Sequence, residues 1–206
     1  MGEHLYTYID PPNRRHLDQI VEVLRKNGVI AIPTGTSWAF CVDPASKKAR
    51  TRMVRLKPSH GTDTRFSLIC RDISMATSIT LIDGRAFRLL NRLWPGPYTI
   101  LLPSQHSLHR QLRTKRAVVG VRIPVAPLAM VIIEAFGGPL LVSSVPKDAH
   151  GALPTMGYEV FERFGRVVDL VVDLGDVMPG DPTTVIDCTM STPEVIRVGA
   201  GDVSRL

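Results

Sequence analysis

The sequence contains no long hydrophobic run and only three cysteines in 206 residues. Because a membrane-spanning helix needs about 20 apolar residues in succession, we expect no membrane partner. The opening residues MGEHLYTY lack the basic and apolar segments of a secretory signal. The cysteines are widely spaced and form no Cys-x-x-Cys pair, which favours reduced, largely buried thiols over disulfides or metal ligands. These absences predict a cytoplasmic protein.

Acidic residues are scarce in the middle of the chain. Between Lys47 and Arg122 there are 16 Lys and Arg against 3 Asp and Glu, whereas the rest of the chain has 9 against 16. A segment this basic favours a polyanionic partner such as RNA or a nucleotide, although a solubilising surface that binds nothing has the same composition. The residues that we predict to contact RNA phosphates are Arg110, Arg113, Lys115 and Arg116.

Two other chemistries lack the partners that they require. His106 and His109 have a spacing that metal ligands use, but no carboxylate or cysteine is near them in the sequence. Ser143 and Ser144 lack the glycines of a nucleophile elbow. We therefore predict no metal site and no hydrolase triad.

Apolar periodicity predicts helices that alternate with strands early in the chain and strands that cluster late. The expected helices are 14–27, 45–56, 84–93, 108–112, 128–136 and 158–164. The expected strands are 29–32, 66–70, 98–102, 118–123, 140–143, 167–174, 184–188 and 195–198. No linker divides the chain, so we predict one α/β domain over residues 1–206, with a mixed sheet between helices.

The strand at 29–32 is followed by Pro33 and then by four small residues, Thr34-Gly35-Thr36-Ser37. Small residues at the carboxyl end of a strand can leave N–H groups and hydroxyls available to an anion. The same residues also build ordinary turns, so this segment alone does not decide between a turn and a binding loop.

Six segments, read in order, resemble the YrdC family. They are Gly28–Trp38, Arg55–Pro58, Trp94–Thr99, Gly120–Pro124, Val142–Val145, and Thr183–Asp187 with Arg197. The family-like region covers about residues 13–200. Ala39 and the segments 70–74 and 86–90 are most similar to the YciO branch of the family. The resemblance implies a twisted, mixed, open sheet with helices on its faces and a basic concave surface.

The resemblance also implies an activity: synthesis of L-threonylcarbamoyladenylate from ATP, L-threonine and bicarbonate, linked to tRNA modification. ATP would enter with Mg²⁺ as a substrate, and no tightly bound cofactor is expected. By motif position, Lys57 and Ser143 are the expected catalytic residues. The expected substrate- and nucleotide-binding residues are Thr34, Thr36, Arg122, Thr183 and Arg197.

Two positions depart from the family pattern. The arginine of the Lys-x-Arg motif falls on Ser59, and the asparagine of the Ser-Ala-Asn motif falls on Val145. Both changes remove hydrogen-bond donors, which predicts a weakened synthase unless another group, such as Arg65, compensates. The alternative is a protein without catalysis that uses the same scaffold to bind double-stranded RNA or tRNA. A nucleotide-binding regulator is a third, less specific hypothesis.

Overall fold

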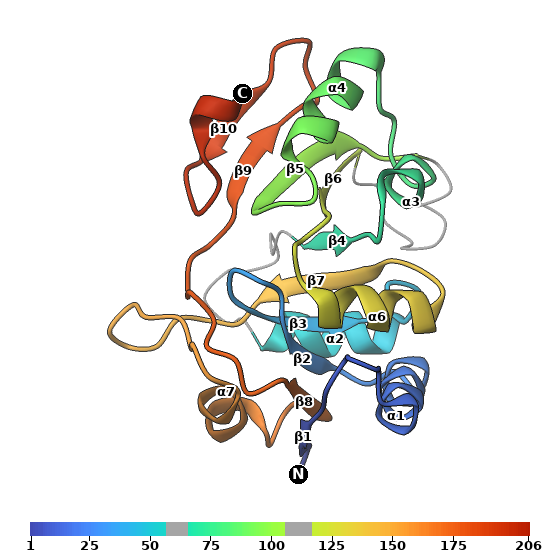
Figure 1. Ribbon diagram of the computed structural model, residues 1–206, viewed down its shortest axis with the longest axis vertical. Helices are drawn as coiled ribbons and strands as arrows, with labels where there is room; N and C mark the ends of the chain where they lie inside the picture. Colours follow the sequence, from blue (N-terminus) through green and yellow to red (C-terminus); the bar gives the residue numbers. More distant parts are fainter. Residues whose placement is uncertain (57–65, 106–116) are drawn as a thin grey trace.

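The computed structural model describes residues 1–56, 66–105 and 117–206 (Figure 1). Its strands are β1 Glu3–Tyr6, β2 Ile30–Pro33, β3 Trp38–Val42, β4 Ser67–Ile69, β5 Tyr98–Pro103, β6 Val118–Arg122, β7 Leu140–Ser144, β8 Leu170–Asp173, β9 Thr184–Asp187 and β10 Glu194–Arg197. Its helices are α1 Arg14–Arg25, α2 Lys47–Arg55, α3 Ile73–Thr77, α4 Gly84–Leu93, α6 Pro127–Phe136 and α7 Gly157–Phe164, followed by a 3₁₀ turn at Val203–Arg205.

All of these strands form one mixed sheet in the order β1-β8-β2-β3-β7-β4-β6-β5-β9-β10. The pairs β1–β8, β2–β8, β4–β6 and β5–β9 are parallel, and the other neighbouring pairs are antiparallel. The predicted α/β class and mixed sheet are therefore confirmed. Strands that are distant in sequence, such as β4 and β7, lie side by side in the sheet.

Apolar side chains cover the two faces of this sheet unequally. On one face, buried residues of β3, β4, β5 and β6 pack against α2, α3, α4 and α7. On the other face, α1 and α6 pack against residues of β1, β8, β2, β3, β7 and β4. That second core contains no residue of β5, β6, β9 or β10. The part of the second face that β5, β6, β9 and β10 form is therefore not covered by the helices α1 and α6.

The predicted helices and strands in the described residues are present, with ends displaced by a few residues. The predicted helix 108–112 lies outside the described residues. The strand predicted from residue 167 begins only at Leu170, because the N–H groups of Val167 and Val168 donate to the Phe164 carbonyl at the end of α7. The patterns missed β1, β3 and α3: β3 is buried at every position and does not alternate, and α3 has only five residues.

The three cysteines are free thiols, and Cys41 and Cys70 are buried, as predicted. Desolvation raises the pKa of the Cys70 thiol to about 12 and that of Cys188 to about 11, so both are protonated at neutral pH. Within residues 1–56, 66–105 and 117–206, no helix has the length and apolar character that crossing a membrane requires.

Gly35 provides a test of the loop that joins β2 to β3. Its φ is +80°, and a Cβ atom there would lie 2.3 Å from the Val125 carbonyl oxygen. Gly137, after α6, has nearly the same φ of +84° with nothing within 4 Å of a built Cβ. Gly137→Ala should cost only the left-handed backbone strain, about 1–2 kcal/mol. Gly35→Ala should cost a further ~1–3 kcal/mol, because the new methyl group collides with the backbone.

Urea unfolding of the two variants measures this difference. Equal losses in the free energy of unfolding would show that the loop can move away from Val125. The claim that this loop is held close to Val125 would then be wrong.

Candidate functional site

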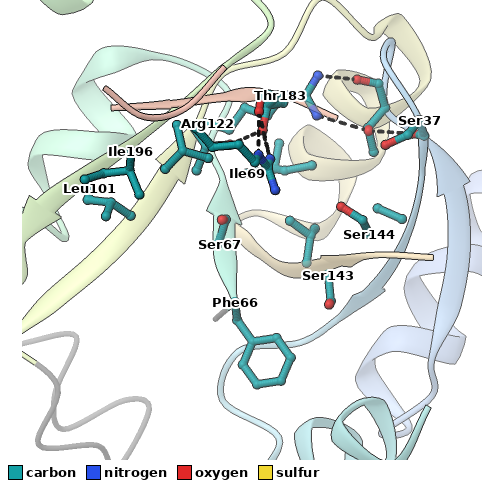
Figure 2. A pocket seen from close by; sticks show the side chains of 16 residues that line it. Ser37, Phe66, Ser67, Ile69, Leu101, Arg122, Ser143, Ser144, Thr183 and Ile196 are labelled. Atoms are coloured by element: carbon teal, nitrogen blue, oxygen red, sulfur yellow. Dashed lines mark hydrogen bonds between the residues drawn. The ribbon is translucent and has the colours of Figure 1, made fainter. Parts of the chain in front are cut away.

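A cavity of about 500 Å³ lies where the part of the second face covered by α1 and α6 meets the strands β5, β6, β9 and β10 (Figure 2). Its polar lining residues are Thr34, Ser37, Ser67, Thr99, Arg122, Ser143, Ser144, Thr183 and Arg197. Its other lining residues are Ala39, Phe66, Ile69, Leu101, Val142, Val185 and Ile196. No acidic residue is among these lining residues, which come from β3, β4, β5, β6, β7, β9, β10 and adjoining loops.

The register of the strands explains how these residues meet. Arg122 on β6 is paired with Ile69 on β4, and Arg197 on β10 is paired with Val185 on β9. Because paired residues of neighbouring strands point to the same face, both arginines reach the open side of the sheet. Gly120 lies between Ser67 and Leu101 in the next row. A Cβ atom at Gly120 would lie 2.8 Å from the Ser67 hydroxyl, so this glycine lets the strands and the serine pack closely.

Arg122 is the most unusual residue of the cavity. It is only 7% exposed, and no carboxylate pairs with it among the described residues. Its Nη1 donates to Thr34 Oγ1 at 3.1 Å and its Nη2 to the Thr34 carbonyl at 2.8 Å, but its Nε has no partner there. Burial lowers the pKa of Arg122 to about 10, which leaves the guanidinium charged at neutral pH. A buried cation without an anion is costly, so this position is suited to a negatively charged ligand.

The loop between β2 and β3 fixes Thr34 beside this arginine. Pro33 pairs with Trp38, and the residues between them form a hairpin loop. The Thr34 N–H and hydroxyl both donate to the Ser37 carbonyl, at 3.0 and 2.7 Å. The segment is therefore a turn whose own groups hold one another, and Thr34 contributes to the cavity by orienting Arg122.

Thr36 does not line the cavity, although sequence motifs placed it with the substrate-binding residues. Its carbonyl accepts hydrogen bonds from the N–H groups of Gly180 and Asp181, which tie the loop to the connection between β8 and β9. Its hydroxyl is buried without a partner among the described residues.

Arg197 and Thr183 form a second polar group in the cavity. Arg197 donates from Nη2 to the Thr183 carbonyl at 2.7 Å and to its hydroxyl at 3.3 Å. The Thr183 hydroxyl is also 2.9 Å from the Thr99 hydroxyl. Partial burial lowers the pKa of Arg197, which is nevertheless far more exposed than Arg122. The cavity therefore has a buried cation and a more exposed one.

Ser143 lies near the end of β7 and is 5% exposed. Its hydroxyl has no partner in the described part of the chain, like the Arg122 Nε, and both residues line the same cavity. In Figure 2, the Ser143 side chain points away from Ser144, to the side of Phe66, as expected from its pairing with Phe40 of the first apolar core. Buried polar atoms usually have hydrogen-bond partners, so each of these two atoms indicates a place for a polar group of a ligand, and the register puts the two places on opposite faces of the sheet.

The structure thus brings together Thr34, Arg122, Ser143, Thr183 and Arg197, five residues that the sequence nominated from separate segments. Lys57, Ser59 and Arg65 lie outside the described residues, as do the predicted RNA contacts Arg110, Arg113, Lys115 and Arg116. Their roles stay predictions.

Sequence reasoning did not select several polar residues of the cavity. Thr99 belongs to a matched motif, Trp94–Thr99, and could have been included on that ground. Ser144 is next to Ser143 in another matched motif. Ser67 has no sequence signal except its place on a short strand, because only pairing with Gly120 and Val142 brings it to the cavity.

Val145 does not face the cavity either. It is 1% exposed, belongs to the apolar core, and donates its N–H to the Trp38 carbonyl. An asparagine missing at this position therefore removes no donor from the cavity lining of this chain. The expectation that Val145 weakens the site in that way is not supported by its position.

Comparison with known proteins places the chain in a family. The Sua5/YciO/YrdC family model, described as telomere recombination, matches residues 22–199, and the chain belongs to this family. YciO of Escherichia coli K12 is 35% identical over 204 residues, which are 98% of each protein. The crystal structure of E. coli YciO matches with a TM-score of 0.90 over 100% of this chain and 99% of that one.

More distant relatives include proteins named for an activity. The threonylcarbamoyl-AMP synthase of Coxiella burnetii is 26% identical over 185 residues, 88% of this chain and 96% of that protein. The crystal structure of Pyrococcus abyssi Sua5 complexed with L-threonine has a TM-score of 0.83 at 23% identity. It covers 97% of this chain and 57% of the Sua5 chain, and it shows the same fold.

The position of Val145 gives a stability prediction. Val145→Asn should lower the free energy of unfolding by about 1–3 kcal/mol, because it buries an amide away from water. The matched control is Ser144→Asn, at an exposed neighbouring position that lines the cavity, where the change should stay within about 0.5 kcal/mol. Chemical denaturation measures both. If Val145→Asn were as stable as the control, the side chain would have to reach the cavity.

Proposed function

We propose that this protein is an L-threonylcarbamoyladenylate synthase with a low rate, acting on L-threonine, bicarbonate and ATP in the cavity lined by Arg122 and Arg197. The observation that carries the proposal is the buried guanidinium of Arg122, which has no carboxylate partner among the described residues. The named activity of the Coxiella burnetii relative supports the reaction, and the L-threonine complex of Sua5 supports one of the substrates.

The chemistry of the substrates fits the lining of the cavity. Threonine and bicarbonate bring carboxylate-type oxygens, and ATP brings a triphosphate with its Mg²⁺. The planar donors of Arg122 suit a carboxylate or a phosphoryl group, and the more exposed Arg197 suits a second anion nearer the solvent. Among the described residues the Ser143 hydroxyl has no partner, so it can donate to a part of a ligand that reaches the Phe66 side of the cavity. In our proposal these fixed donors stabilise the negative charge that develops as the adenylate forms and pyrophosphate leaves.

The low rate follows from Ser59. A serine in place of the motif arginine lacks a charge and a planar fork, and losing one such group typically costs about 10²–10³ in rate. Lys57 stays the proposed catalytic cation, and Arg65 the proposed substitute for the missing arginine. The product would serve the threonylcarbamoyl modification of tRNA.

Arg122→Lys tests the proposal at its central residue. Lysine keeps the charge but loses the fork, so pyrophosphate release from ATP, L-threonine, bicarbonate and Mg²⁺ should fall by about 10²-fold or more. The control is Arg71→Lys, at an exposed arginine paired with Asp72 outside the cavity, which should keep the wild-type rate.

The threonine dependence of that rate separates the synthase from the alternatives. Pyrophosphate release that requires both threonine and bicarbonate supports the synthase. Release that is independent of threonine, or an Arg122→Lys variant at the wild-type rate, would contradict it. Thermal stabilisation by ATP and threonine without turnover would favour the regulator. The RNA-binding alternative rests on the basic cluster 110–116. It predicts neither threonine-dependent release of pyrophosphate nor thermal stabilisation by ATP and threonine.

A further inference from the structure

A second hollow, of about 450 Å³, lies along the outer side of α4, away from the cavity of the proposed activity. We call it the α4 groove. It is lined by Arg85, Arg88, Leu89, Arg92, Pro193 and Leu206. None of these residues lines the first cavity, so a ligand of the α4 groove would not occupy the proposed active site. Figure 1 shows α4 at the end of the molecule that also carries β9 and β10.

The spacing of the three arginines places them on one side of the helix. Residues 85, 88 and 92 are three, four and seven positions apart, which brings their side chains into one row. The row spans about 10 Å, at 1.5 Å per residue. Leu90 and Leu93 point into the core and fix this orientation. Arg205 donates to the Arg92 carbonyl at 2.5 Å, which adds a fourth guanidinium at the end of the helix.

Acidic neighbours do not neutralise this row. Asp83 caps α4 by accepting hydrogen bonds from the N–H groups of Arg85 and Ala86. Asp202 accepts from the N–H and hydroxyl of Ser204; these hydrogen bonds, and to a smaller extent the charge of Arg205, lower the pKa of its carboxyl. Among the described residues, no ion pair involves any of the three arginines of the row.

The shape of the groove argues for a polymer over a small ligand. All three arginines are exposed, whereas small-molecule pockets bury most of their ligand. Arginine suits phosphate, because its planar fork makes two parallel hydrogen bonds and its flat face stacks on bases. The three guanidinium groups of the 10 Å row can contact up to about three phosphates of a strand, one for each arginine. The apolar floor of Leu89, Pro193 and Leu206 offers a surface to an unpaired base.

We infer that the α4 groove binds a single strand of RNA through its phosphates, independently of the proposed synthase activity.

The test measures fluorescence anisotropy of a labelled 12-nucleotide oligouridylate with the full chain at several salt concentrations. Three phosphate contacts predict that log K falls with log salt at a slope of about −2 for a single strand. Replacing Arg85, Arg88 and Arg92 together by Gln should weaken binding at low salt at least tenfold and flatten the slope by about two units. The charge-matched control replaces Arg14, Arg15 and Arg25 of α1 by Gln, which removes the same charge from exposed positions elsewhere.

Normal binding by the control together with weak binding by the α4 variant supports the groove. Equal losses in both variants would mean that only net charge matters, and an unaffected α4 variant would place the RNA elsewhere. Either result overturns the inference. The inference is also overturned if the protein binds the duplex of oligouridylate and oligoadenylate, or anionic phospholipid vesicles, more tightly than it binds the single-stranded oligouridylate. The single variant Arg88→Glu repeats the test with one change, and circular dichroism verifies that each variant is folded. Pyrophosphate release should be unchanged in the α4 variant.

Discussion

The cost of burying the Arg122 guanidinium, which has no carboxylate partner in the part of the chain that the structure describes, shapes the whole site. This charged group is 7% exposed and donates two hydrogen bonds to one residue, Thr34, while its Nε has no partner among the described residues. Thr34 can do this because the β2–β3 loop is closed by its own hydrogen bonds and passes close to Val125 at Gly35. A protein gains nothing in stability from such an arrangement, since an apolar side chain of similar size would avoid the desolvation cost. An anionic ligand that pairs with the guanidinium would offset this desolvation cost.

The packing of the sheet determines where that anion can lie. Helices seal one face across β3, β4, β5 and β6, but α1 and α6 cover only part of the other face. The strands that remain open carry Thr99, Gly120 and the two arginines on this face, together with the apolar residues Leu101, Val185 and Ile196. The cavity is therefore a consequence of an incomplete helical layer, and Arg122 and Arg197 come to it from strands that the register aligns.

Much of the fold could be predicted from the sequence, because periodic segments such as 84–93 and 128–136 carry their own signal. The sequence motifs also led to Arg122, Ser143, Thr183 and Arg197. Ser67 could not be found in this way, since its role depends on which strands become neighbours, and pairings between distant segments leave no local pattern. Thr36 and Val145 do not line the cavity for a related reason. A motif gives the position of a residue in the chain, whereas the turn and the strand decide which way its side chain points.

The central claim is that Arg122 exists to bind an anionic substrate and not to stabilise the fold. Isothermal titration calorimetry of ATP and L-threonine, with wild type and Arg122→Met, tests it most directly when the free energy of unfolding is measured on the same samples. The account predicts that the variant binds at least about 100-fold more weakly, because a charge-assisted pair is lost, while its unfolding free energy is unchanged or higher. Wild-type affinity in the variant, or a large loss of stability with affinity intact, would contradict it.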